Sequence, residues 1–361
     1  MKVHLEELAL AQAYDRSHPF EGLTAEQMKS IMDRGRALHR WFRNHLYFHN
    51  ALSVSVFVFL FVADFLTLVS LPQWLLPRGA SHSTLRIIMA SAVVGGLHSW
   101  LVYSIAVFSM HEGAAHDVIF VVKGRIGRIL SFVANNLCRL AASEPIYYSA
   151  QHMSHHAKFG TTDDGELLNF VSPKRYWLTF VPLAAFINFS DFIVHRPMKY
   201  TASRIVSAMV ALSYNLPYAI YLYWNYGTLF VVFAMVVVFP HFGFYLDRLR
   251  QFTEHNLMPL DNKNGSRSFG MGFWGMLAGG GPWGSPCHWE HHLVASLPWY
   301  QQLALHRHVV GLLSERQRAQ FLIEPFIGFP RLWWRIWRET RSFEKRTAVA
   351  GDGSPTRSSC V

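Results

Sequence analysis

The chain has 361 residues, of which 51% are hydrophobic and only 16% are charged, which is too apolar for an ordinary soluble domain. Its formal net charge of +10 is compatible with nucleic acid as a partner, but the basic residues flank apolar stretches and form no separate basic fold. Anionic membrane lipids are therefore the expected partner, and nucleic acid is not.

Residues 1–47 are predicted to form an amphipathic cytoplasmic lead-in. The stretch "TAEQ" at 24–27 reads as a capping box that begins a helix. Apolar residues then recur at helical spacing with basic residues between them, which suits a helix lying on the membrane surface or one packed on the protein's own cytoplasmic face. Because the first 40 residues contain no signal-peptide pattern, we expect the N-terminus to stay in the cytoplasm.

Four apolar runs follow, at residues 49–76, 86–110, 205–224 and 227–245. A helix needs about 20 apolar residues to cross a bilayer, and each run is close to that length. The last two are separated only by residues near "NYG". The sequence thus predicts an all-α integral membrane protein with four transmembrane helices in two hairpins.

Basic residues predict the orientation of these helices, because cytoplasmic loops are rich in Lys and Arg. The short loop 77–85 contains only Arg78. The segments expected on the cytoplasmic side contain Lys29, Arg34, Arg36, Arg40, Arg43, Lys123, Arg125, Arg128, Arg139, Arg248 and Arg250. We expect a multi-pass protein with its active site and N-terminus on the cytoplasmic side.

The rest of the chain divides simply. Residues 48–345 are predicted to be one membrane domain, and the small, polar residues 346–361 a disordered tail. Within the domain, residues 176–195 are apolar but interrupted by polar residues and a proline, which favours an in-plane or partly buried helix over a span. Cysteines with no paired spacing indicate a reducing compartment; they are Cys138, Cys287 and Cys360.

Histidines gather in three clusters: "HEGAAH" at 111–116, "QHMSHH" at 151–156 and "HWEHH" at 288–292. In the H-x-x-H-H spacing of the last two, the first histidine shares a helix face with both others. A lone histidine such as His98 or His195 is more simply a structural hydrogen-bonding residue. Eight imidazoles exceed the needs of one metal ion, so the clusters indicate two ions, for which iron, copper, nickel and zinc are all suited to imidazole.

These clusters, their order and the paired spans resemble the integral-membrane fatty acid desaturase and hydroxylase superfamily over about residues 50–310. The third cluster continues as that family's pattern does, with Pro298, Tyr300, Leu303 and His306. Val294 and Ala295 depart from the Phe-Pro common in the family.

The segment "RLRQFTEHN" at 248–256 resembles the family's Glu-His element and makes His255 a ninth candidate ligand. His241 and His308 are nearby alternatives to His255 and His306. The ligand set that the resemblance implies is His111, His116, His152, His155, His156, His255, His288, His291 and His292.

The resemblance implies a membrane-bound non-haem enzyme whose cytoplasmic helical cap holds two Fe ions, with O2 as co-substrate and a fatty acyl or lipid chain as substrate. Desaturation is favoured, while hydroxylation and oxidative decarboxylation to a terminal alkene remain open. Reduction of O2 to water takes four electrons and desaturation supplies two, so a separate electron donor is implied, a ferredoxin or a cytochrome with its reductase. The basic residues Lys174, Arg175, Arg196 and Lys199 are candidates for docking it.

A ligating histidine usually donates its second ring N–H to a nearby acceptor, which fixes the orientation of the ring. We therefore expect such acceptors beside the candidate ligands. The candidates, together with the last histidine of the pattern, are Gln251, Glu254, Glu290, Asp117 and His306. Glu112, Asp163 and Asp164 are further acidic neighbours. The glycine-rich segment 270–284 lacks the context of a phosphate loop and is a candidate lid beside the site.

Two other classes fit less well. A membrane metal transporter places its ligands within the spans near the bilayer midplane, whereas these clusters lie at span ends and beyond. A zinc hydrolase needs only three or four ligands, and this chain offers eight or nine.

Overall fold

The computed structural model is helical throughout the residues that it describes, which are 20–164 except 123 and 162, 201–323 except 284 and 285, and parts of 331–342. These ranges contain no strand, and a single isolated bridge pairs Ser268 with Leu322. The predictions for 176–195 and for the tail 346–361, and the suggested docking residues between 174 and 199, lie outside the described residues.

The helices run in chain order as follows: α2 (Ala25–Asn44), α3 (Leu46–Val69), α4 (Leu71–Leu75), α5 (Thr84–Val107), the π-helix η1 (Phe108–Ala115), α6 (Gly124–Asn136), the 3-10 helix η2 (Leu137–Ala141), α7 (Pro145–Lys158), α10 (Thr201–Val231), the π-helix η6 (Val232–Val238), α11 (Phe239–His255), α12 (Phe273–Ala278), α13 (His288–Leu293), α14 (Trp299–Leu312) and α15 (Glu315–Phe321).

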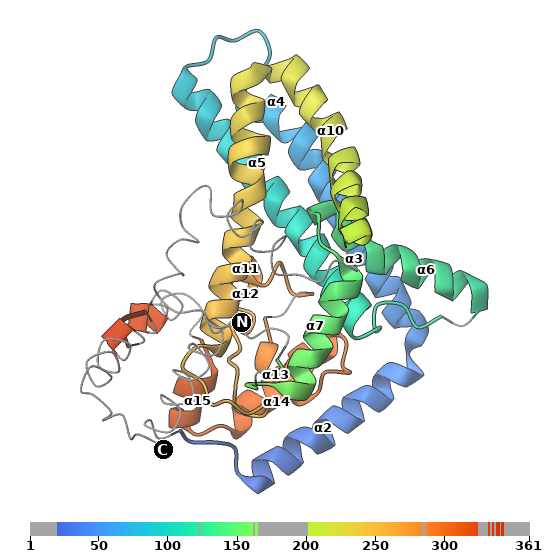
Figure 1. Ribbon diagram of the computed structural model, residues 1–361, viewed down its shortest axis with the longest axis vertical. Helices are drawn as coiled ribbons and strands as arrows, with labels where there is room; N and C mark the ends of the chain where they lie inside the picture. Colours follow the sequence, from blue (N-terminus) through green and yellow to red (C-terminus); the bar gives the residue numbers. More distant parts are fainter. Residues whose placement is uncertain are drawn as a thin grey trace, which may run out of the picture.

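Three helical stretches are long and apolar enough to cross a membrane: Leu46–Leu75, Thr84–Ala115 and Ala202–Asp247. The third has 46 residues, far more than the roughly 20 that one crossing needs. Its helix is broken at Gly227, whose φ of 79° lies in the left-handed region that glycine adopts without strain. Figure 1 shows the chain turning back there, so that η6 packs against α10 and then continues into α11.

Helix α5 lies at the centre of this bundle and packs against α3, α10, η6 and α11. A glycine on α5 permits the closest approach, since a Cβ atom on Gly95 would lie 2.4 Å from the carbonyl oxygen of Ala234. Small residues of this kind let helices pack tightly where hydrophobic burial cannot drive association. Apolar side chains of α3 instead face outward, as a lipid environment requires, among them Val58, Phe59, Val62, Phe65 and Leu66.

A buried polar network ties three of these helices together. His98 on α5 contacts Asp64 of α3 through Nδ1 at 2.6 Å and Asn215 of α10 through Nε2 at 2.7 Å. The Tyr214 hydroxyl donates to the second oxygen of Asp64 at 2.6 Å. His98 is thus the structural hydrogen-bonding histidine that the sequence predicted.

The capping box at the start of α2 is confirmed: the backbone N–H of Gln27 donates to the Thr24 hydroxyl, and that of Thr24 donates to the Gln27 side chain. Its buried residues Ile31 and Leu38 share a core with residues of α14, against which α2 packs. Of the two alternatives that the sequence left open, the structure therefore shows α2 contacting the protein itself. Figure 1 places α2 across the end of the bundle that also holds α7, α13 and α14.

The glycine-rich segment that contains α12 lies against α5. Trp100 donates through its indole N–H to the carbonyl of Leu277 at 2.9 Å, and the Tyr103 hydroxyl donates to that of Ala278 at 2.9 Å. Gly280 follows with φ of 72°, and a Cβ atom there would lie 3.3 Å from the backbone of Ser104. Two hydrogen bonds from α5 therefore hold this segment near the end of α5 that continues into η1.

Candidate metal centre

The first histidine cluster lies on a π-helix that continues α5. His111 and His116 are five positions apart, a spacing that puts two residues on different faces of an α-helix with about 3.6 residues per turn. The wider turn of η1 brings their rings to 5.4 Å between centroids. Such π-helical turns are frequent at functional sites, and this one lets both rings point to one side.

The second and third clusters lie on α7 and α13, and both keep the helical spacing that the sequence predicted. Helix α7 begins at Pro145 behind Glu144, whose carboxylate accepts two backbone N–H groups at the helix start. The remaining candidate, His255, is the last residue of α11. Four elements far apart in the sequence therefore deliver nine imidazoles to one end of the bundle.

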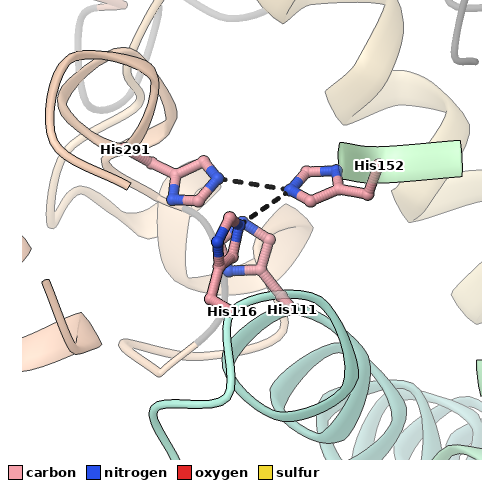
Figure 2. A group of neighbouring side chains, drawn as sticks. All are labelled: His111, His116, His152 and His291. Atoms are coloured by element: carbon pink, nitrogen blue, oxygen red, sulfur yellow. Dashed lines mark hydrogen bonds between the residues drawn. The ribbon is translucent and has the colours of Figure 1, made fainter. Parts of the chain in front are cut away.

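Five of these imidazoles form a first set: His111, His116, His152, His156 and His291. The Nε2 atom of His152 lies 3.2 Å from that of His116 and 3.3 Å from that of His291. The Nε2 atom of His156 lies 2.8 Å from that of His291 and 3.1 Å from that of His152. Figure 2 shows the rings of His111, His116, His152 and His291 converging on a shared point.

The other four form a second set, His155, His255, His288 and His292, each buried. Here the Nε2 atom of His288 lies 2.9 Å from that of His255 and 3.1 Å from that of His292. The sets adjoin, because the ring of His156 stacks obliquely against that of His292 with centroids 4.6 Å apart.

These nitrogen spacings fit metal ions. Around an ion bound at about 2.0–2.1 Å, neighbouring nitrogen ligands lie roughly 2.9–3.4 Å apart in tetrahedral or octahedral arrangements. The observed Nε2 separations run from 2.8 to 3.3 Å. Buried imidazoles that approach one another so closely, nitrogen to nitrogen, have a physical reason to do so if their lone pairs share a cation.

In the second set, the contacts of the outward ring nitrogens show which nitrogen carries the proton of each neutral ring. The Nδ1 atom of His155 donates to Asp164 at 2.8 Å, and that of His255 donates to the carbonyl of Gly265 at 3.1 Å. The Nδ1 atom of His292 donates to the Asn262 side-chain oxygen at 2.7 Å. Each partner atom only accepts, so the proton of the neutral ring stays on Nδ1 and the Nε2 lone pair faces the set.

The charge state of the third cluster agrees. Burial first, and then the neighbouring imidazoles, lower the pKa of His288, His291 and His292 well below the ordinary value. All three are therefore neutral near pH 7, as a ligating imidazole must be.

Among the predicted supporting residues, Asp164 contacts a ligand ring directly and Glu254 lies close to another. Its Oε2 atom is 3.7 Å from Nε2 of His288 and accepts a hydrogen bond of 2.7 Å from Arg250. Gln251 donates through its side-chain amide to Asp247, one helical turn earlier, at 3.1 Å.

Glu290 and His306 contact each other. His306 donates through Nδ1 to Glu290 at 2.7 Å, and Ser268 donates to the other carboxylate oxygen. Burial opposes ionisation of Glu290, but the charge and hydrogen bond of His306 outweigh it and lower the pKa of this carboxyl. Cys287 lies close enough to complete a small cluster with this pair. The hydrogen bond between Glu290 and His306 connects α13 with α14.

Two predicted positions lie elsewhere. Asp117 is exposed, with φ of 52°, and among the described residues its carboxylate has no hydrogen-bonding partner. His308 contacts Ser30 of α2 at 3.1 Å and takes no part in either set. The sequence missed Asn262 and the Gly265 carbonyl, because both lie in an irregular loop whose path no periodicity reveals.

Comparison with known proteins agrees with this geometry. Residues 87–323 match the fatty acid desaturase family, and this range contains all nine histidines of the two sets. No curated protein matches the chain. Because the match covers most of the sequence and carries the resemblance first seen in the three clusters, the chain belongs to the fatty acid desaturase family.

Proposed function

We propose that this protein is a membrane-bound di-iron enzyme that uses O2 to oxidise an unactivated C–H bond in a fatty acyl or lipid chain. Introduction of a double bond is the favoured outcome, and hydroxylation or decarboxylation to a terminal alkene are its alternatives on the same scaffold. The observation that carries the proposal is the pair of adjoining imidazole sets at one end of an apolar helical bundle.

In this proposal each set holds one iron ion. The first ion would be bound by the five histidines of the first set and the second by the four of the second set. When bound, the two irons supply the activation of O2 and the removal of hydrogen from carbon, chemistry that no side chain here can perform.

The residues of the chain hold and orient these ligands. Asp164, Asn262 and the Gly265 carbonyl fix the ring protons on Nδ1 and so keep the second set ready for metal. The ion pair between Arg250 and Glu254 brings a buried carboxylate beside His288 without leaving its charge unpaired.

We further propose that the stretch Ala202–Asp247 crosses the bilayer twice, with its turn at Gly227, which gives four spans. The loop between α4 and α5 lies at that same end, opposite the imidazole sets. The basic residues of α2 and α6 lie at the end that holds the sets, which supports a cytoplasmic site and N-terminus. A ferredoxin or a cytochrome with its reductase would supply electrons from that side.

The test is expression in a bacterial host with gas-chromatographic analysis of fatty acids, hydroxy acids and headspace alkenes. We expect a new product that is lost in His291→Ala. His82→Ala is the matched control, because this histidine contacts the Pro77 carbonyl in the loop at the far end of the bundle. Retained turnover in His291→Ala, or loss of turnover in His82→Ala, would contradict the assignment.

A further inference from the structure

A group of buried polar atoms adjoins the first imidazole set. Each of them has no hydrogen-bonding partner among the described residues. The side chains are Ser53 of α3, Glu112 of η1, Trp283, and Trp299 and Tyr300 of α14. The buried ring of His49 on α3 lies among them, within hydrogen-bonding reach of the Val118 and Ile119 backbone.

The group begins at the metal-binding histidines. The Oε1 atom of Glu112 lies 3.5 Å from Nδ1 of His111, while its Oε2 atom accepts the backbone N–H of Trp299 at 3.0 Å. Glu112 is 1% exposed, so this carboxylate links the first set directly to the start of α14 inside the protein.

Ring contacts connect the other members. The ring of Trp299 lies 6.4 Å from that of Trp283 and 5.6 Å from that of Tyr300. The ring of Tyr300 lies 5.9 Å from that of His49, and Ser53 follows His49 by one helical turn. Burial raises the pKa of Tyr300 to about 12, so its hydroxyl keeps its proton and can donate.

An unpaired polar group inside a protein is unfavourable, and native structures contain few of them. Here five neighbouring side chains carry such atoms beside the first imidazole set. Indole N–H groups can only donate, and the hydroxyls and the imidazole can also donate, so the group suits a ligand that offers acceptor oxygens.

The charge of the group restricts that ligand further. None of its side chains is a Lys or an Arg. A carboxylate or phosphate would bring a negative charge into this buried group with no cation to pair it, which is costly in a low-dielectric interior. An uncharged carbonyl or hydroxyl oxygen fits both the donors and the charge.

We propose that this group binds the uncharged oxygen-bearing end of the substrate next to the metal centre, so that the C–H bond attacked lies close to that end and not in mid-chain. The inference rests on the proposed function, and it adds to that function a substrate class and a position of attack. Because reacting atoms must approach within about 3–3.5 Å, a chain anchored by its oxygen here presents its first carbons to the irons.

The experiment compares octadecanol, octadecanoate and octadecane as substrates of the purified, iron-loaded protein with its electron donor. Mass spectrometry of derivatised products locates the new functional group. We expect turnover of octadecanol near the oxygenated carbon, and a KM that rises roughly three- to tenfold in Tyr300→Phe, as loss of one hydrogen bond predicts. Tyr47→Phe is the control, because this side chain is 94% exposed.

Mid-chain products from every substrate, equal use of octadecane, or an unchanged KM in Tyr300→Phe would overturn the proposal and leave the group binding ordered water only. If no substrate is oxidised by iron-loaded protein, the proposed function fails. The binding proposal is then judged by the Kd of octadecanol from quenching of tryptophan fluorescence, where equal Kd values for the natural protein and Tyr300→Phe would refute it.

Discussion

The contact between Asp164 and His155 offers a sharp test of how the protein holds its second imidazole set. The carboxylate of Asp164 accepts the Nδ1–H of His155 at 2.8 Å and the backbone N–H of Gly160 at 2.9 Å, and both side chains are buried. In Asp164→Asn the shape is kept, but one of these two donors must face the new amide N–H. The variant therefore disturbs the ring of His155 without opening a cavity.

The expected size of the effect follows from these contacts. A charge-assisted hydrogen bond contributes about 1.5–3 kcal/mol, and loss of a partner behind a metal-binding histidine costs about 10–100-fold in metal affinity, or roughly 1.4–2.8 kcal/mol. We expect the second ion to be weakened by this factor and the first to be nearly unaffected, since His155 belongs only to the second set.

The assay is the iron content of purified protein after dialysis against a series of chelator concentrations. Asp164→Asn should pass from two irons per chain to one at about 10–100-fold lower chelator strength than the natural protein. Asp163→Asn is the matched control, because this neighbour only pairs with Lys158, 3.1 Å away, on an exposed surface. An exposed pair of this kind contributes about 0–1 kcal/mol.

If Asp164→Asn releases iron no more easily than Asp163→Asn, His155 does not bind metal through Nε2 and the second set is wrongly assigned. Simultaneous loss of both ions would instead show that the sets do not bind independently.

Three further outcomes are expected. Gly95→Ala should lower the melting temperature strongly, because the added Cβ would lie 2.4 Å from the Ala234 carbonyl oxygen. Gly96→Ala should change it little, because the nearest atom to its added Cβ lies at 3.9 Å, and equal shifts in the two variants would contradict the packing. Asp64→Asn should destabilise the protein by about 1–3 kcal/mol, measured by unfolding in detergent, because a buried hydrogen-bonding partner of His98 and Tyr214 is altered. The paired replacement of Asp64 and His98 by leucine should cost less than the sum of the single losses, and additive losses would argue against a coupled pair. Removal of metal by a chelator should lower the melting temperature, because a metal that binds only the folded state stabilises it. Added iron should restore the original value, and an unchanged melting temperature would count against resident ions.

Much of the site was predictable because its spacing is local. The H-x-x-H-H pattern fixes a shared helix face, and both α7 and α13 have that face directed at the metal centre. The pairing of His111 with His116 was not predictable in the same way, because five positions match no α-helical face and the π-helix that resolves this has no clear sequence signature.

The supporting residues were harder to identify. Glu254 and Glu290 stood out because they lie inside the motifs, yet Glu290 contacts His306 and Ser268. Asp164, which the sequence named only as a further acidic neighbour, and Asn262, which it missed, contact ligand rings. These contacts depend on how loops fold back over the helices, which residue periodicity does not encode. The turn at Gly227 was easier to anticipate, because the sequence predicts two apolar runs separated near "NYG", and the left-handed residue that divides them is the glycine of that stretch.

The central claim is that the nine imidazoles hold two iron ions, and it is tested most directly by metal analysis and iron X-ray absorption on the active, purified protein. We predict close to two irons per chain, each surrounded by nitrogen ligands typical of imidazole, with two distinct losses when His152→Ala and His288→Ala are compared. An active protein that contains zinc as its main metal, or a single iron, would contradict the account.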